Sequence, residues 1–417
     1  MIAFGTRGDV QPAVALGKAL KAEGHNVRLI AGLNFQNWIE QHGLEAVASK
    51  IDIQTLMESE LGRDWIEKGY NPIVQMKIIK QLTDQTGWQM MTDAWEACRD
   101  AEIIFSSFTS DIYALSIAEK LRAKHISIPF QPALFPTRSG AATMNAPLPD
   151  RNSIINYFFG KLLLEPANWR LSGKMTNNFR QQVLDLPSQT RSDYLNAKRR
   201  LFTVQAYSRH VVPHPEDWPS NIHTTGYWFL DEQNHWEAPR DLLEFLDAGE
   251  PPVCIGFGSM VGRNLEQITG IMIDAVRESG RRAVLLSGWA GIGNAELGNN
   301  IYRLDAAPHE WLYPRAAAAV HHGGAGTTAA SLRAGTPTII VPHLGDQPYW
   351  GKRVHSLGAG PKPIPRNKLT AAALAAAIRD ATSSPDMKKR AEELGASISA
   401  EDGVGIAIEL IKRYLHS

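Results

Sequence analysis

One pattern begins twice in the 417-residue sequence: a short apolar strand, a glycine-containing loop and an amphipathic helix. In the first copy MIAF precedes the loop GTRGD, and a helix with Pro12 in its first turn ends near Gly24, before the strand NVRLI. In the second copy PPVCIGF, GSMVGRN and LEQITGIMIDAVRESG follow in the same order. Strands alternate with helices in both halves, which indicates parallel sheets. We therefore predict an α/β protein with two Rossmann-like domains facing a central cleft.

Domain boundaries follow from changes in composition. A Pro- and Trp-rich stretch, residues 216–240, separates the two patterns and predicts a linker. The expected domains are residues 1–215 and residues 241–400, a division that suits the length of the chain. Residues 401–417 are expected to form a C-terminal helix that could cross back to the N-terminal domain.

The charge balance, the cysteine content and the lengths of the apolar runs restrict what kind of protein this is and where it works. Lys and Arg total 43, as do Asp and Glu, so nothing predicts nucleic-acid binding. Only Cys98 and Cys254 are present, and without a signal-peptide pattern this favours a reducing, cytoplasmic location. No apolar run reaches the roughly 18 residues of a spanning helix. The most apolar stretch, residues 153–166, is interrupted by Gly160, Lys161 and Pro166 and could contact a membrane surface peripherally.

The loop HHGGAGTT, residues 321–328, follows an apolar strand and precedes a helix. Such a turn exposes backbone N–H groups at the positive end of the helix dipole, where a diphosphate can bind. The hydroxyls of Thr327 and Thr328 could cap the helix or contact phosphate, and His322 could add a donor or a charge. The alternative is a tight turn whose glycines serve packing alone.

Other strand ends supply polar groups on the same side of the predicted sheet. Asp346 and Gln347 follow the next strand, and a carboxylate beside an amide suits adjacent sugar hydroxyls. The loop 305–314 could meet the edge of a base through its main chain, and GFGSM, residues 256–260, is a second small-residue turn. Trp289 could stack on a base or be a half-buried packing residue.

These motifs together resemble the family 1 glycosyltransferases of the GT-B fold, and most closely the sterol 3β-glucosyltransferases of fungi and bacteria. Antibiotic glycosyltransferases are the next nearest group. The resemblance covers nearly the whole chain, through GTRGDVQPAVALGKALKAEGHNV, TTGYWFLD, IGFGSM, the Pro-His-Glu-Trp-Leu stretch, HHGGAGTTAASLRAGTPTIIVP and GDQPYWGKRV. MIAF is shorter than the family's usual first strand, so the chain could be a trimmed catalytic domain of a larger protein.

The resemblance implies an N-terminal acceptor-binding domain and a C-terminal domain that holds a UDP-sugar donor. The resemblance implies that Ser259, His322, Gly324, Gly326 and Thr327 bind the diphosphate. It implies that Asp346 and Gln347 bind the sugar. It also implies that Trp289, Ala307 and His309 lie around the uracil. Plant members carry a Trp at the position of Ala306 and a Glu near Ala330. Both are absent here, which affects the expected contacts to base and ribose.

The reaction needs a general base to take the proton of the acceptor hydroxyl. Asp9 is the one base-capable side chain of the first loop, because the guanidinium of Arg7 does not lose its proton. From local sequence alone Asp9 could equally be a helix cap, and the family resemblance favours the base. Asp111 could support the site or cap a later helix, and His25 is expected to be structural.

No Asp-x-Asp motif or metal-ligand spacing occurs, so we expect an inverting transfer from UDP-glucose without metal or cofactor. The expected acceptor is a sterol or another flat apolar molecule, bound with help from apolar stretches such as 57–95. The alternatives are transfer to a macrolide, polyphenol or triterpenoid, a UDP-sugar 2-epimerase, or a non-catalytic sugar-nucleotide-binding subunit.

Overall fold

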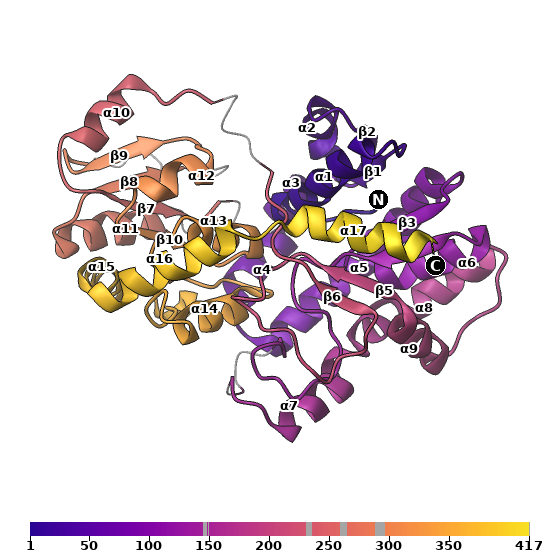
Figure 1. Cartoon of the computed structure of the whole chain (residues 1–417). Coiled ribbons are helices and arrows are strands. Elements are labelled where there is room, and N and C mark those ends of the chain that lie inside the picture. Colours follow the sequence, from indigo (N-terminus) through magenta and orange to yellow (C-terminus); the bar gives the residue numbers. More distant parts are fainter. Residues whose placement is uncertain (145–147, 149, 231–235, 259–264, 288–296, 417) are drawn as a thin grey trace. The chain divides into compact units, whose positions relative to one another are not determined.

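The computed structural model describes residues 1–144, 148, 150–230, 236–258, 265–287 and 297–416. The chain divides into two compact units, whose elements can be followed in Figure 1. Unit 1 comprises Met1–Leu56, Lys77–Leu230 and Glu401–Ser417. Unit 2 comprises Met57–Met76 and Asp231–Ala400. The main boundary therefore falls inside the stretch 216–240, while residues 57–76 join unit 2 from the N-terminal part of the chain.

Unit 1 is built on parallel strands. Its strands are β1 (Arg28–Ala31), β2 (Glu45–Ala48), β3 (Ile103–Ser106), β4 (Lys124–Ser127), β5 (Phe202–Gln205) and β6 (Ile222–Thr224). They pair as β1-β2 and as β3-β4-β5-β6. Ile2 forms isolated parallel bridges with Ile30 and with Ser106, and so lies between β1 and β3. The segment MIAF therefore takes the expected place in the sheet, as a bridge rather than a full strand.

Unit 1 also contains helices before, between and after its strands. They are α1 (Arg7–Ala22), α2 (Gln36–Gln41), α6 (Asp111–Leu121), α7 (Ile154–Phe159), α8 (Ala167–Gln182), α9 (Arg191–Arg200) and α17 (Gly403–His416), with a 3-10 turn, η1 (Leu33–Phe35), and a π-helical turn, η2 (Gly160–Leu164). Helices α3 (Ile53–Glu58) and α5 (Pro72–Cys98) each contribute residues to both units. Val14 and Leu16 of α1 pack with Leu29 of β1 and Ile408 of α17 in one buried core. This packing places the C-terminal helix in unit 1.

Unit 2 contains one five-stranded parallel sheet of order β11-β10-β7-β8-β9. Its strands are β7 (Val253–Gly256), β8 (Ala283–Leu286), β9 (Ile301–Leu304), β10 (Ala318–His321) and β11 (Thr338–Ile340). The chain adds β8 and β9 on one side of β7, and then β10 and β11 on the other. The strand order therefore reverses between β7 and β10, where open α/β sheets bind their ligands.

Helices precede, connect and follow the strands of unit 2. They are α4 (Glu60–Lys68), α10 (Arg240–Asp247), α11 (Leu265–Ser279), α12 (His309–Leu312), α13 (Ala325–Arg333), α14 (Gln347–Ser356), α15 (Ala371–Ser383) and α16 (Pro385–Ser399), with 3-10 turns η5 (Tyr313–Arg315) and η6 (Arg366–Lys368). Cys254, Val284 and Ala319 of three neighbouring strands pack against Leu242 of α10 and Leu312 of α12. The buried thiol of Cys254 is thus part of the core.

The predicted α/β class with parallel sheets is confirmed, but the start of the first helix was predicted wrongly. Helix α1 begins at Arg7, so Pro12 lies inside the helix and not in its first turn. The cause is Asp9, whose carboxylate accepts the backbone N–H of the N-cap residue Thr6 and starts the helix earlier.

Candidate functional site

The two glycine loops of unit 2 meet at the point where the strand order reverses. His321 at the end of β10 is paired in register with Gly256 at the end of β7. Gly258 follows β7 with a φ of +59°, and a Cβ there would lie 3.8 Å from Cε1 of His322. The main-chain turn after β7 and the side chain after β10 are therefore neighbours across the switch point.

The two histidines of HHGGAGTT have different roles. His321 is buried, its Nδ1 accepts the N–H of Gly323 at 3.0 Å, and its Nε2 lies 3.2 Å from Oγ of Ser331. It therefore holds the loop to its own helix. Gly323 has a φ of +89°, and a Cβ there would come within 2.5 Å of Cγ2 of Ile340, so both backbone conformation and space require glycine.

The N-terminus of α13 is open. Gly324 is its N-cap residue, no side chain among the described residues caps the helix, and the first turn holds no acidic residue. Gly326 is exposed and Thr327 is partly buried in this turn. The first N–H groups of a helix have no intrahelical acceptor, so they form a ready site for an anion.

His322 lies beside this helix end. A Cβ on Gly324 would be 2.6 Å from Nε2 of His322, so the imidazole lies close to the backbone where the helix begins. Its Nδ1 is buried and has no hydrogen-bond partner among the described residues. Burial, and then the neighbouring His309, lower the pKa of His322 to about 4. His322 is therefore neutral at pH 7 and can offer a hydrogen bond, which excludes the expected positive charge in the ligand-free protein.

Asp346 and Gln347 lie at the start of α14. Asp346 is the N-cap residue, and its Oδ2 accepts the indole N–H of Trp350 at 2.6 Å. Burial raises the pKa of Asp346 to about 6, against the lowering effect of this hydrogen bond. Oε1 of Gln347 accepts the N–H groups of His343 and Leu344 at 2.7 and 3.0 Å. The amide thus fixes the loop that presents the carboxylate.

The structure also brings Gln347 next to the HHGG loop. A Cβ on Gly323 would lie 3.3 Å from the carbonyl oxygen of Gln347 and 3.6 Å from its Cβ. The described residues that were predicted for the diphosphate and the sugar therefore lie on adjacent loops. Sequence reasoning missed Trp350, although its spacing of four residues from Asp346 on one helix is a readable signal.

The residues expected near the uracil are only partly described. Ala307 and His309 lie after β9, where both are partly buried, and the ring of His309 stacks on Tyr313 with centroids 4.8 Å apart. The predicted positions Ser259 and Trp289 lie outside the described residues. The contacts expected for the base therefore stay predictions.

Asp9 lies in unit 1, at the third position of α1. Its Oδ2 accepts the backbone N–H of Thr6 at 2.8 Å and the Thr6 hydroxyl at 3.3 Å. Gly5, with a φ of +150°, leaves room for this carboxylate, which a Cβ on Gly5 would overlap. Asp9 therefore takes part in capping α1, although it is not the N-cap residue itself. Sequence reasoning overlooked Thr6, although Thr followed three residues later by an acid is a capping-box pattern.

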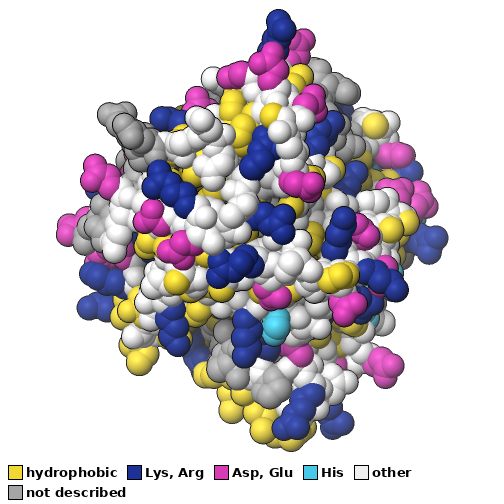
Figure 2. All heavy atoms as spheres, turned by 90° about the vertical axis from the view of Figure 1, so that its left-hand side faces the viewer, with side chains coloured by type: hydrophobic (Ala, Val, Ile, Leu, Met, Phe, Trp, Pro, Cys, Tyr) yellow, Lys and Arg dark blue, Asp and Glu magenta, His cyan; other side chains and the backbone are white. Residues whose placement is uncertain are grey.

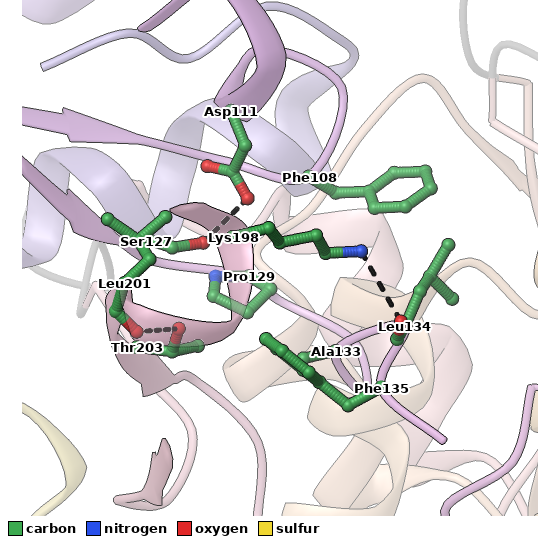
Figure 3. A pocket seen from close by; sticks show the side chains of 10 residues that line it. All are labelled: Phe108, Asp111, Ser127, Pro129, Ala133, Leu134, Phe135, Lys198, Leu201 and Thr203. Carbon is green, nitrogen blue, oxygen red and sulfur yellow. Dashed lines mark hydrogen bonds between the residues drawn. The ribbon is translucent and has the colours of Figure 1, made fainter. Parts of the chain in front are cut away.

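Asp111 is buried and lines a small, mainly apolar pocket of unit 1 (Figure 3). Ser110 is the N-cap residue of α6, so the capping interpretation of Asp111 is wrong. Its carboxylate instead accepts the hydroxyls of Ser106 at 2.5 Å and Ser127 at 2.8 Å, on the ends of β3 and β4. Burial raises its pKa to about 6 and is the main cause that lowers the pKa of nearby Lys198 to about 8.

The hydrogen bonds around Asp111 stabilise the sheet of unit 1 from inside. Figure 3 shows Lys198 reaching the carbonyl of Leu134, 3.3 Å from Nζ, while Asp111 points to Ser127. His25, which was expected to be structural, is exposed after α1, and its backbone N–H donates to the carbonyl of Leu20. Nothing in its surroundings gives it a role beyond that hydrogen bond.

Two models of known protein families match the N-terminal and the C-terminal part of the chain. A model of the glycosyltransferase family 28 N-terminal domain matches residues 1–118, and a model of the erythromycin biosynthesis protein CIII-like C-terminal domain matches residues 284–409. The calicheamicin glycosyltransferase CalG4 has a similar fold, with a TM-score of 0.70, 15% identity, and coverage of 100% of this chain and 97% of that one. The chain belongs to the glycosyltransferases of the GT-B fold.

Within this class the chain is similar over its whole length to sterol 3-beta-glucosyltransferases. The protein of that name from Neosartorya fischeri is 36% identical over 99% of this chain, and the one from Arabidopsis thaliana is 34% identical over 100% of it. The chain spans 29% of the length of the first and 65% of the second. None of the helices formed by the described residues is long and apolar enough to cross a membrane.

Proposed function

We propose that this chain transfers glucose from UDP-glucose to the 3-hydroxyl of a sterol, with inversion at the anomeric carbon. The observation that carries the proposal is the meeting, at the switch point of unit 2, of the uncapped N-terminus of α13 with His322 and the loop of Asp346. The whole-chain similarity to sterol 3-beta-glucosyltransferases supports the choice of acceptor.

The open end of α13 would bind the donor diphosphate. Its unpaired N–H groups and the helix dipole stabilise negative charge, and this charge grows on the diphosphate as the glycosidic bond breaks. The neutral imidazole of His322 would donate one further hydrogen bond. We propose that these groups stabilise the leaving group without a metal ion, and that the reaction uses no cofactor.

The sugar would be held by the carboxylate of Asp346. Its hydrogen bond from Trp350 fixes one oxygen, and the pKa of about 6 leaves the group ionised at pH 7 to accept sugar hydroxyls. Gln347 would support this contact by holding the loop in place.

Asp9 would take the proton of the acceptor hydroxyl as that oxygen attacks the anomeric carbon. Its attachment to Thr6 at the first turn of α1 fixes the direction of the carboxylate. Attack from the side opposite the leaving diphosphate converts an α-linked donor into a β-linked product, which is the basis of the proposed inversion.

A second candidate acceptor is a natural product such as a macrolide, polyphenol or triterpenoid. The match of residues 284–409 to an erythromycin biosynthesis domain favours it. Peripheral contact with a membrane and a cytoplasmic location belong to the sterol proposal, because a sterol acceptor is dissolved in a bilayer.

The test is turnover of UDP-glucose with a panel of sterols, macrolides and polyphenols, followed by mass spectrometry. We expect a mass gain of one hexose on sterols, and a β-glucoside by proton NMR coupling of the anomeric hydrogen. Turnover of polyphenols or macrolides with no sterol product would move the chain to the second candidate. An α-glucoside product would contradict inversion, and sugar interconversion without any acceptor would indicate the epimerase.

A further inference from the structure

One surface of unit 1 exposes large apolar side chains from consecutive helical turns. The α7 surface is formed by Ile154, Ile155, Phe158, Leu162 and Leu163, whose exposed fractions lie between 49% and 62%. They belong to α7 and to the π-helical turn η2 that continues it. Such a contiguous apolar group is unusual on a protein surface and marks an interaction site.

The opposite side of this segment is firmly attached to unit 1. Asn156 is buried, and its Nδ2 donates to the carbonyls of Arg138 and Arg151 at 3.0 and 2.9 Å. A Cβ on Gly160 would lie 3.1 Å from Cα of Pro136, so the helix backbone packs closely on the loop beneath. The apolar side chains are therefore presented by an ordered scaffold.

The exposed charges within the segment of the α7 surface, residues 151–174, have one sign. Residues 151–174 contain four basic residues, all exposed: Arg151, Lys161, Arg170 and Lys174. The one acidic residue of this range, Glu165, is buried and forms an ion pair with Arg199 at 2.7 Å. Figure 2 shows hydrophobic and basic side chains together at the lowest end of the view, the height at which Figure 1 shows α7.

A second group of exposed apolar residues, in unit 2, has three members against the five of the α7 surface. Tyr70, Ile73 and Met76 are exposed there, but the segment 58–84 carries acidic and basic residues together. Among the described residues, the α7 surface combines exposed Phe, Ile and Leu side chains with exposed charges that are all basic within residues 151–174. This combination is typical of helices that lie in the interface of an anionic membrane.

We propose that the α7 surface docks the protein on a bilayer that contains anionic lipids. The apolar side chains would enter the boundary between headgroups and acyl chains, and Arg151 and Lys161 would meet the lipid phosphates. A second copy of the same surface is a poorer partner, because it would bring like charges together. The inference rests on the proposed function, since a sterol acceptor is supplied by a bilayer.

The test uses vesicles without sterol and without donor, so that its outcome does not depend on the proposed function. The full chain should sediment with vesicles that contain phosphatidylserine and much less with vesicles of phosphatidylcholine alone. The double variants Ile155→Ser/Phe158→Ser and Arg151→Glu/Lys161→Glu should each weaken binding to the anionic vesicles by about tenfold or more.

Matched controls change the same residue types elsewhere. Leu243→Ser/Ile406→Ser alters exposed apolar residues of α10 and α17, and Lys388→Glu/Lys389→Glu reverses exposed charges of α16. Both should bind like the unmodified protein. The proposal is overturned if anionic vesicles bind no better than neutral ones, or if the α7 variants bind normally. It is also overturned if light scattering shows a dimer that the α7 variants dissociate.

Discussion

Helix α1 of unit 1 and helix α13 of unit 2 both follow a glycine loop at the end of a sheet segment, yet their first turns differ. At α1, the carboxylate of Asp9 accepts the N–H of Thr6 and places a negative charge in the first turn. At α13, the N-cap is Gly324, with no capping side chain and no acidic residue in the first turn. One helix start carries its own anion, and the other leaves that position to a ligand.

This difference indicates how one local pattern can serve two purposes. A carboxylate at a helix start is stabilised by the dipole and by N–H donors, so it is held in a fixed direction. A helix start without one keeps its donors for a bound diphosphate. We propose that unit 1 uses the pattern to position a base and unit 2 to bind the leaving group.

The largest effect is expected for Asp9→Asn. The amide oxygen can still accept the N–H of Thr6, so the melting temperature and the affinity for UDP-glucose should hardly change. The amide cannot accept the acceptor proton, so kcat at saturating donor should fall by roughly 10²–10⁴. Steady-state kinetics and thermal unfolding of the same preparation measure both quantities.

The chain offers a matched control for this substitution. Helix α9 begins with the same arrangement, in which Oδ2 of Asp193 accepts the N–H of Thr190 at 2.8 Å and its hydroxyl at 2.7 Å. Asp193→Asn should leave kcat within about twofold, because only a cap is altered. Normal turnover by Asp9→Asn would exclude the base assignment, and equal losses in both variants would attribute the effect to capping.

A pair of alanine substitutions separates the two loops. Gly5→Ala forces a φ of +150° on alanine and overlaps the carboxylate of Asp9, so it should lower kcat and destabilise the protein by ~1–3 kcal/mol. Gly324→Ala keeps a φ of −61°, so stability should hold. Its Cβ would lie 2.6 Å from Nε2 of His322, so the imidazole must move and donor affinity should fall about tenfold.

Calorimetry measures the affinity of both variants for UDP-glucose, and thermal unfolding measures their stability. Gly5→Ala should leave the donor affinity unchanged, and Gly324→Ala should leave the melting temperature unchanged. A Gly324→Ala protein that binds the donor normally would contradict the role of His322 and the adjacent helix start. Normal stability and turnover of Gly5→Ala would contradict the close fit of Gly5 to Asp9.

Much of this fold could be predicted from the sequence. Apolar strands, helical periodicity and glycine loops are local patterns, and they predicted the parallel arrangement and all strands except β2 and β6 of unit 1. Strand β6 even lies inside the stretch 216–240 that was predicted to be a linker. The attachment of residues 57–76 to unit 2 was not predictable in this way. It depends on packing between segments far apart in the chain, such as the 3.2 Å hydrogen bond from the N–H of Gly345 to the side chain of Gln75.

The candidate site, too, could be predicted from the sequence only in part. Residue types and spacing pointed to His322 and Asp346, and the structure brings their loops together. The sequence could not distinguish His321 from its neighbour, because strand alternation alone does not say which imidazole faces the core. Nor could it predict that burial lowers the pKa of His322 to about 4, since that depends on the surrounding atoms.

A smaller effect is expected from the pH dependence of donor binding. Asp346 has a pKa raised to about 6 by burial, so its carboxylate is protonated as the pH falls through this value. Between pH 8 and pH 5 the affinity for UDP-glucose should weaken by about fivefold to tenfold, because about a tenth of the carboxylate stays ionised at pH 5. The diphosphate diester keeps its charge over this range.

Asp346→Asn isolates this group. The amide oxygen can still accept the N–H of Trp350, but the side chain no longer titrates, so affinity for UDP-glucose should be weaker and flat between pH 5 and pH 8. Calorimetry at several pH values measures both proteins. A wild-type profile that is already flat, or a variant that keeps the wild-type slope, would show that Asp346 does not hold the sugar.

The smallest effect is expected from removal of metal ions. Within the parts of the chain that the structure describes, no group of three His, Cys, Asp or Glu side chains is arranged to hold a cation. The proposed diphosphate site offers N–H donors and one neutral imidazole, which complement an anion directly and do not need a bridging cation. Turnover in EDTA should therefore stay within about twofold of the untreated rate, and added magnesium should change it little.

Gly324→Ala is the informative companion to the EDTA experiment, because an anion site weakened by a displaced imidazole should not be rescued by magnesium. Complete loss of turnover in EDTA that magnesium restores would assign the leaving-group charge to a metal ion, and the open start of α13 would then have to be explained by some other ligand.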